Sequence, residues 1–276
     1  MEKWRLLIHD PLKGKENMAI DEAIMKAVLR EEVPPTIRFY RWAPPCVSLG
    51  YFQKAKQQVD LDACTNHGFD VVRRPTGGRA VLHKEELTYS IAVREDHPKI
   101  PREVVKAYKV LSTGLMIGLN SMGFFAKMSE TSEEKLNTQS SAACFDAPSW
   151  YELVVQDYKI IGSAQVRKNG ALLQHGSVPI KFELENLISV LHFPSEKQRE
   201  KTKRVLKQKA AGLQEIKPAS MEVEINWENL TSYFKKGFEV GLGIELVEGS
   251  LFETEKQEAK HLEEEKYALD DWNFKR

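Results

Sequence analysis

Strand-type patterns fill much of the first two thirds of the chain, and helix-type patterns follow them. Residues 36–42 alternate in the period of a strand, and residues 46–52 form its expected partner after the Pro44-Pro45 break. The same reasoning predicts further strands at 70–73, 87–93, 153–155, 159–166 and 172–178. After Pro179, helices are predicted near 184–192, 195–208, 227–241 and 252–265. This order favours an α+β fold, in which helices flank a mixed β-sheet.

Helical patterns also interrupt the strand-rich part. Residues 17–31 place Ile20, Ala23, Ile24, Ala27 and Val28 on one face, with Asn17 as the expected N-cap. A short helix is predicted at 61–66 before Gly68, and a long one at 102–122. Residues 128–140 are polar and aperiodic, which predicts a surface loop. No repeat or linker divides the chain, so we expect one domain over 1–276. Its catalytic core would span about 33–248, with a helical C-terminal segment, about 250–276, packed on it.

Charge and cysteine content narrow the class of protein. The 40 basic and 40 acidic residues sum to a formal charge of zero, which argues against a dedicated nucleic-acid binder. The uncharged run 110–126 is shorter than the ~20 apolar residues of a membrane-spanning helix, so a buried core helix is expected instead. Three cysteines match no zinc or disulfide pattern, and the start of the chain does not resemble a signal peptide. We therefore expect a cytoplasmic protein with free thiols.

The densest unusual segment runs from Arg73 to His83 and contains Gly77-Gly78. Glycines in a turn between strands let the backbone approach a ligand closely, and their N–H groups can hold an anion or a carbonyl oxygen. Flanking arginines would add cationic donors. The alternative is a Gly-Gly hairpin with solvated arginines.

Two further segments carry reactive side chains. Lys159 directly precedes the apolar run 160–164. If its side chain is buried among these residues, its pKa is lowered. The alternative is an ordinary lysine at a strand edge, which faces solvent. Cys144 stands among small residues and is either a buried structural thiol or a nucleophile that needs a cationic neighbour. Lys159 is close enough in sequence to be that neighbour. Cys46 and Cys64 have no distinctive setting, so we assign both to structure.

Several common sites are missing from the sequence. It contains no phosphate-binding loop, no dinucleotide-binding glycine motif and no Gly-x-Ser-x-Gly elbow. No two of its seven histidines are within five residues of each other, so we expect no metal site.

Three segments together resemble one family. They are Arg-Arg-Pro-Thr-Gly-Gly-Arg-Ala-Val-Leu-His, Cys-Phe-Asp-Ala-Pro-Ser-Trp-Tyr-Glu-Leu and Lys-Ile-Ile-Gly-Ser-Ala-Gln. The chain is similar to the lipoate-protein ligase and lipoyl/octanoyl transferase superfamily, which shares its fold with the biotin-protein ligase catalytic domain. Within it, the likeness is greatest to LipM-type octanoyltransferases of Gram-positive bacteria. It extends from residues 17–22, through 39–42, to 266–273.

This resemblance implies a function and a set of site residues. Octanoyl would move from octanoyl-acyl carrier protein to a lysine of a lipoyl domain, typically that of the glycine-cleavage H protein. The transfer would need no cofactor, metal, nucleic acid or membrane, and the enzyme would act as a monomer. The family's thioester-forming cysteine falls on Cys144 and its nearby lysine on Lys159. Its substrate-binding residues fall on Arg74, Gly77, Gly78, Arg79, His83, Gly162, Ser163 and Ala164.

Three other interpretations stay open at this point. An ATP-dependent lipoate-protein ligase shares the Gly-Gly loop and the lysine but needs no nucleophilic cysteine. An amidotransferase acting between lipoyl domains uses a cysteine in a different motif. The segment 197–209 holds seven Lys or Arg residues and one Glu, so it could bind nucleic acid, form a solvated helix face, or steer an acidic carrier protein.

Overall fold

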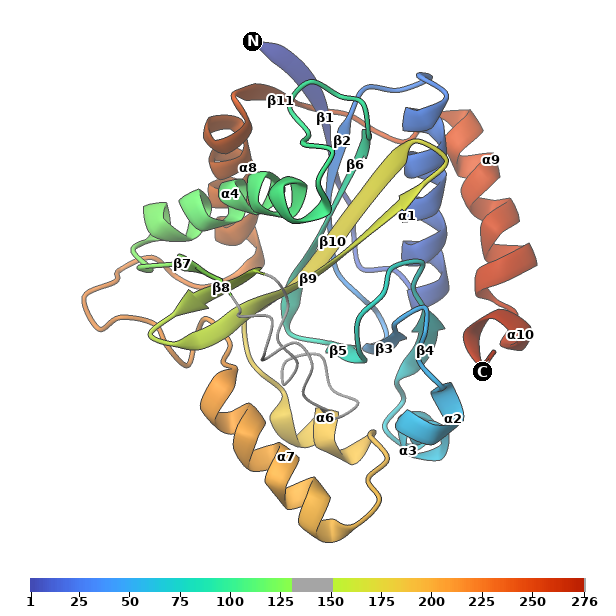
Figure 1. Ribbon diagram of the computed structural model, residues 1–276, viewed down its shortest axis with the longest axis vertical. Helices are drawn as coiled ribbons and strands as arrows, with labels where there is room; N and C mark the ends of the chain where they lie inside the picture. The colour runs from blue at the N-terminus through green and yellow to red at the C-terminus, as the bar shows by residue number, and fades with distance from the viewer. Residues whose placement is uncertain (131–150, 276) are drawn as a thin grey trace.

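The computed structural model describes residues 1–130 and 151–275, and its centre is a mixed β-sheet. The strand order is β11 (Ile244–Glu248), β1 (Glu2–Ile8), β2 (Thr36–Tyr40), β6 (Glu86–Arg94), β10 (Ala171–Pro179), β9 (Tyr158–Lys168), β8 (Tyr151–Val155) and β7 (Lys127–Glu130). β1 runs parallel to both of its neighbours, and every other pair is antiparallel. Helices cover both faces, so the predicted α+β class is confirmed (Figure 1).

Two pairs of helices bury the two faces of this sheet. α4 (Val104–Met122) and α8 (Trp227–Leu242) pack together on one face, where Leu111, Leu115, Phe234 and Phe238 are fully buried. On the other face lie α1 (Gly14–Leu29) and α9 (Glu253–Leu262), side by side (Figure 1). Burying apolar side chains on both faces is the main stabilising contribution to such a layered fold.

A smaller sheet lies beside the main one and has its own core. Its order is β4 (Asp70–Arg73), β3 (Cys46–Leu49) and β5 (Val81–His83). Four helices surround it: α2 (Ala55–Gln58), α3 (Leu61–Asn66), α6 (Leu184–Ser189) and α7 (Glu196–Lys209). Side chains such as Val47, Leu49, Leu187 and Leu206 form this second core. The small sheet therefore holds the loop between β4 and β5, which contains Gly77-Gly78, against the main sheet.

The C-terminal segment returns to the small sheet and is fastened there by Arg73. After α9, a π-helical turn (Glu263–Tyr267) and α10 (Asp270–Asn273) lead the chain back to β4. The buried Arg73 guanidinium donates to backbone carbonyls of this segment and of the turn after β3. These carbonyls belong to Trp272, Asn273, Lys275, Gly50, Tyr51 and Gln53. One buried side chain thus joins the end of the chain to the base of the Gly-Gly loop.

Most predicted elements occur, with four differences. The strand at 46–49 is not the partner of the strand at 36–40, because the Pro44-Pro45 segment leads the chain from the main sheet, where β2 pairs with β1 and β6, into the small sheet, where β3 pairs with β4 and β5. Asn17 is not the N-cap of α1, because the helix begins at Gly14, with Lys13 as its N-cap; the Asn17 side chain instead donates to Leu12 and Arg41 carbonyls. Residues 128–130 belong to β7 rather than to a loop, while 131–140 lie outside the described residues. Four strands were not predicted, namely β1, β5, β7 and β11, and neither were the short helices α2 and α10. Within the described ranges, no helix is both long and apolar enough to span a membrane.

Candidate active site

A mostly apolar cavity opens where the small sheet meets the main sheet. Residues of β3, β5, β9 and β10 form part of its wall. The lining residues are Met18, Tyr40, Trp42, Ser48, Arg74, Gly78, Val81, His83, Thr88, Gly162, Ser163, Ala164, His175, Gly176 and Ser177. A few polar groups converge on an otherwise apolar wall, which is typical of small-molecule sites. Such a cavity suits a short acyl chain.

Arg74 fixes the conformation of the Gly-Gly loop. Its guanidinium donates to the carbonyls of Gly77 and Arg79 and to both oxygens of Ser48, at 2.7–3.2 Å. Gly78 has φ +93°, and a Cβ there would lie 2.8 Å from the Arg74 guanidinium. A Cβ on Gly50 would lie 1.9 Å from the Gly78 carbonyl oxygen. The loop is therefore packed backbone against backbone, which only glycine permits at these positions.

One wall of the cavity carries a chain of three hydrogen-bonded side chains. The Ser48 Oγ lies 2.8 Å from Nε2 of His83, and Nδ1 of His83 lies 2.7 Å from Oε1 of Glu86. Glu86 also accepts hydrogen bonds from the Thr88 and Ser177 hydroxyls, and Trp42 stacks on the His83 ring at 4.1 Å. In the neutral ring, Nδ1–H donates to Glu86 and Nε2 accepts from Ser48.

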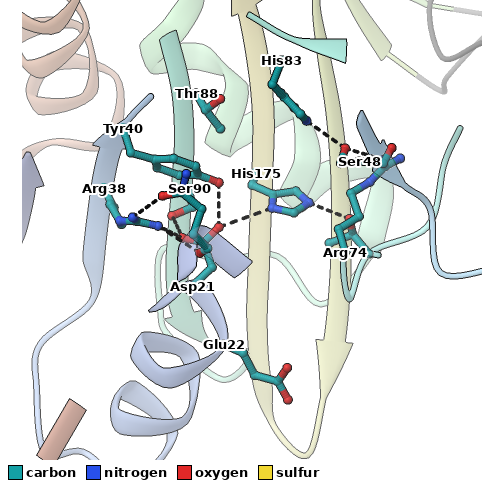
Figure 2. A network of polar contacts seen from close by, with 12 residues as sticks. Asp21, Glu22, Arg38, Tyr40, Ser48, Arg74, His83, Thr88, Ser90 and His175 are labelled. Atoms are coloured by element: carbon teal, nitrogen blue, oxygen red, sulfur yellow. Dashed lines mark hydrogen bonds and ion pairs between the residues drawn. The ribbon is translucent and has the colours of Figure 1, made fainter. Parts of the chain in front are cut away.

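The main-sheet wall carries a second histidine in a separate network. In Figure 2, His175 projects from β10 between Asp21 on one side and the small sheet on the other. Its Nδ1 lies 3.4 Å from Asp21, and its Nε2 lies 2.6 Å from the hydroxyl of Thr76, the residue before Gly77. Asp21 also pairs with Arg38 at 2.8 Å and accepts from the Tyr40 hydroxyl at 2.9 Å. The Gly-Gly loop is thereby tied to the main sheet as well.

Burial and partners set the charge states of these networks. Burial disfavours the charged carboxylates of Asp21 and Glu86, but Arg38 acting on Asp21 and His83 acting on Glu86 outweigh it, so both pKa values are lowered. Burial lowers the pKa of His175 despite the Asp21 carboxylate, and raises that of Tyr40. At neutral pH, His175 is a neutral ring beside an ionised carboxylate.

Lys159 lies on β9, near the cavity but not among the residues that line it. The side chain is 4% exposed, so the solvent-facing alternative is wrong. Lys159 is four positions from the lining residue Ser163, which is about 13 Å along the strand. Its carbonyl accepts from the N–H of Ala211 at 3.5 Å, where the chain leaves α7.

The remaining predicted residues fall in three groups. Six of them line the cavity: Arg74, Gly78, His83, Gly162, Ser163 and Ala164. In the described part of the chain, Gly77 and Arg79 do not line it; Gly77 borders an adjoining groove with Tyr51, and both give their carbonyls to Arg74. Cys144 lies outside the described residues. Cys46 and Cys64 are buried, and burial raises both pKa values, that of Cys64 to about 12, which fits structural roles.

Sequence reasoning missed several residues of the site, among them Ser48 and His175, which line the cavity, and Glu86, which contacts His83. His175 stands in an apolar strand and Asp21 on a helix 154 residues earlier, so no local spacing indicates their contact. Glu86 is three residues from His83, and this short spacing was the one feature of the sequence that indicated their contact.

The chain is similar to known proteins along nearly its whole length. Residues 13–238 match the lipoyl protein ligase A/B catalytic domain family. A Brevibacillus brevis protein named octanoyltransferase LipM is 45% identical over 282 residues, covering all of both chains. Its Bacillus subtilis namesake is 42% identical over 279 residues, covering 100% of this chain and 99% of that one.

Solved structures of ligases have the same fold. The bipartite lipoate protein ligase of Thermoplasma acidophilum, described together with its E2 lipoyl domain, superposes with a TM-score of 0.80 at 27% identity, covering 99% of this chain and 97% of that one. A lipoate-protein ligase A bound with ATP gives a TM-score of 0.78 at 26% identity, with 99% of each chain covered.

Proposed function

The chain belongs to the lipoyl protein ligase A/B catalytic domain family, and we propose that it transfers octanoyl from octanoyl-acyl carrier protein to a lipoyl-domain lysine through a thioester on Cys144. The observation that carries the transfer is the full-length similarity of 40–45% to proteins named octanoyltransferase LipM. The cavity supports it independently, because Met18, Trp42 and Val81 give it apolar walls for an eight-carbon chain.

In the first step, the Cys144 thiolate attacks the carbonyl carbon of the donor thioester. A new C–S bond forms, the C–S bond to the carrier breaks, and the carrier leaves as a thiol after taking up a proton. The exchange replaces one thioester by another, so it is nearly isoenergetic and needs no ATP or other cofactor. Splitting the transfer into two steps also means that only one carrier protein has to be docked at a time.

In the second step, the amine of the acceptor lysine attacks the Cys144 thioester. An amide forms, the C–S bond breaks, and the amine loses a proton as the Cys144 thiol is regenerated. The glycine-cleavage H protein is the acceptor that we propose. An amide is more stable than a thioester, so this step drives the transfer to completion.

Lys159 has one of two roles in these steps. As a cation it would stabilise the Cys144 thiolate; as a neutral amine it would accept the proton of the attacking lysine. The side chain is buried on β9, so it acts within the protein rather than in solvent. Backbone N–H groups near Gly78 or Gly162 are the candidates for stabilising the oxyanion of each step, an effect of about 3 kcal/mol.

The test is transfer in the absence of ATP. Incubation with octanoyl-acyl carrier protein and an apo lipoyl domain should add one octanoyl group to the domain, measured by intact mass, and Cys144→Ala should abolish the addition. Efficient labelling from free octanoate plus ATP, with no transfer from the carrier, would assign the chain to the ligase activity instead.

A further inference from the structure

α7 presents a stripe of cations to solvent. Thr202 and Leu206 are buried and mark the inner face of the helix. At 100° per residue, Lys197, Lys201 and Arg204 fall on a single line opposite that face, and all three are exposed. This stripe of three residues is referred to below as the basic stripe.

Most positive charge on this helix is not neutralised by neighbours. Arg199 pairs with Glu196 at 3.6 Å, and Lys203 pairs with Glu185 at 2.8 Å. The three residues of the basic stripe have no ion pair with any residue in 1–130 or 151–275, and neither do Lys207 and Lys209. Five cations on one helix of 14 residues create a local positive field in a chain whose total charge is zero.

The helix leads directly to the proposed reaction centre. Ala210, the residue after α7, forms a β-bridge with Lys159. Figure 1 shows α7 at the bottom of the view, beside α6 and below β8 and β9. With a rise of 1.5 Å per residue, Arg204 lies about 9 Å and Lys197 about 20 Å along the axis from Ala210.

Building on the proposed function, we propose that the basic stripe docks the donor, an acidic protein that carries octanoyl on a flexible arm. The positive charge of the basic stripe attracts the negative charge of the donor protein. The position favours the donor over the acceptor. An acyl group on a long arm can span the roughly 9–20 Å between the stripe and Ala210, which pairs with Lys159, whereas an acceptor lysine has only a four-carbon stem and must dock closer.

The test separates protein docking from acyl chemistry. A triple charge reversal, Lys197→Glu with Lys201→Glu and Arg204→Glu, is compared with wild type in the first step alone, by the rate of octanoyl addition to the enzyme. Two donors are used: octanoyl-acyl carrier protein and octanoyl-pantetheine, which has no protein part. A matched control reverses three exposed lysines on other helices, Lys106, Lys236 and Lys260.

The expected result is a kcat/KM for the carrier about tenfold lower in the stripe variant, with octanoyl-pantetheine used as well as by wild type. The control variant should keep the wild-type value with both donors. Raising salt should lower the wild-type rate with the carrier and leave the stripe variant nearly unchanged.

Other outcomes overturn the inference without touching the proposed function. An unchanged kcat/KM for the carrier would exclude docking on α7, and slower transfer from the octanoyl-loaded stripe variant to an apo lipoyl domain, measured separately, would assign the stripe to the acceptor. A wild-type enzyme that takes octanoyl from neither donor would instead refute the proposed function.

Discussion

Arginines and lysines serve opposite purposes in two regions of this molecule. At the cavity, Arg73 and Arg74 are buried, and their guanidinium groups donate to backbone carbonyls of three chain segments. On α7, Lys197, Lys201 and Arg204 are exposed and form no ion pair with the described residues. Arg73 and Arg74 stabilise the fold of the site, whereas the three cations of the basic stripe are available to bind a partner.

The difference has an energetic reason. A buried cation is tolerated only when hydrogen bonds replace its lost hydration, so each change at Arg73 or Arg74 leaves carbonyls without donors. An exposed cation keeps its hydration, so its removal changes stability little and changes association more. Substitutions of Arg73 or Arg74 should therefore change the stability of the protein, and substitutions on α7 should change its association with a partner.

Arg74→Met should have the largest effect on stability. The methionine fills similar space but leaves the carbonyls of Ser48, Gly77 and Arg79 without the guanidinium donor. We expect a loss of about 4 kcal/mol in the free energy of unfolding, measured by urea titration. Arg74→Lys keeps the charge but not the planar set of donors, and should recover about half. A loss below about 1 kcal/mol in Arg74→Met would show that the loop does not depend on Arg74.

The sequence predicts the elements of this site better than their contacts. The helix at 61–66 and the strand at 70–73 have the predicted bounds, because each is a local pattern ended by a turn residue. β1 was missed because residues 4–7 are buried on both faces within parallel pairs, so they show no alternation. Its continuous apolar run is also too short to classify on its own.

Roles within the site were predicted less well than positions. Arg74 was expected to bind substrate, and it does line the cavity, but its hydrogen bonds go to the loop that surrounds it. Asn17 was expected to cap a helix; it is buried and also accepts from Arg38. Such uses of a polar side chain depend on residues distant in sequence, which no periodicity reveals.

His9 should make the stability of the fold sensitive to acid. Burial, and then the charge of Arg38, lowers the pKa of His9 to about 4, and its Nδ1 accepts from Arg38 at 2.7 Å. Between about pH 6.5 and 4 the unfolded chain binds a proton here that the folded chain does not, so stability falls as the pH is lowered through this window. We expect a contribution of about 2 kcal/mol between pH 7 and 4.5, given the partial exposure of His9.

The control is His9→Asn, whose amide oxygen can still accept from Arg38. Urea titrations at pH 7 and pH 4.5 should show a smaller loss in this variant than in wild type. The loss should not vanish, because burial also lowers the pKa of His175. An equal loss in both proteins would contradict the assignment to His9.

Lys201→Gln should have the smallest effect, and it tests the exposed cations of α7 as Arg74→Met tests the buried arginines. The change removes one exposed charge and no described ion pair, so the free energy of unfolding should stay within about 0.5 kcal/mol of wild type. The KM for octanoyl-acyl carrier protein should rise about twofold, as expected for the loss of one steering charge. Destabilisation by more than about 1 kcal/mol would mean that the α7 cations support the fold after all.

The central claim is that octanoyl passes through a thioester on Cys144, and intact mass spectrometry tests it most directly. The enzyme is incubated with octanoyl-acyl carrier protein without an acceptor and weighed before and after hydroxylamine. We expect one added octanoyl group that hydroxylamine removes and that Cys144→Ala never acquires. An enzyme that stays unmodified while still transferring octanoyl, or a Cys144→Ala variant that transfers at the wild-type rate, would contradict it.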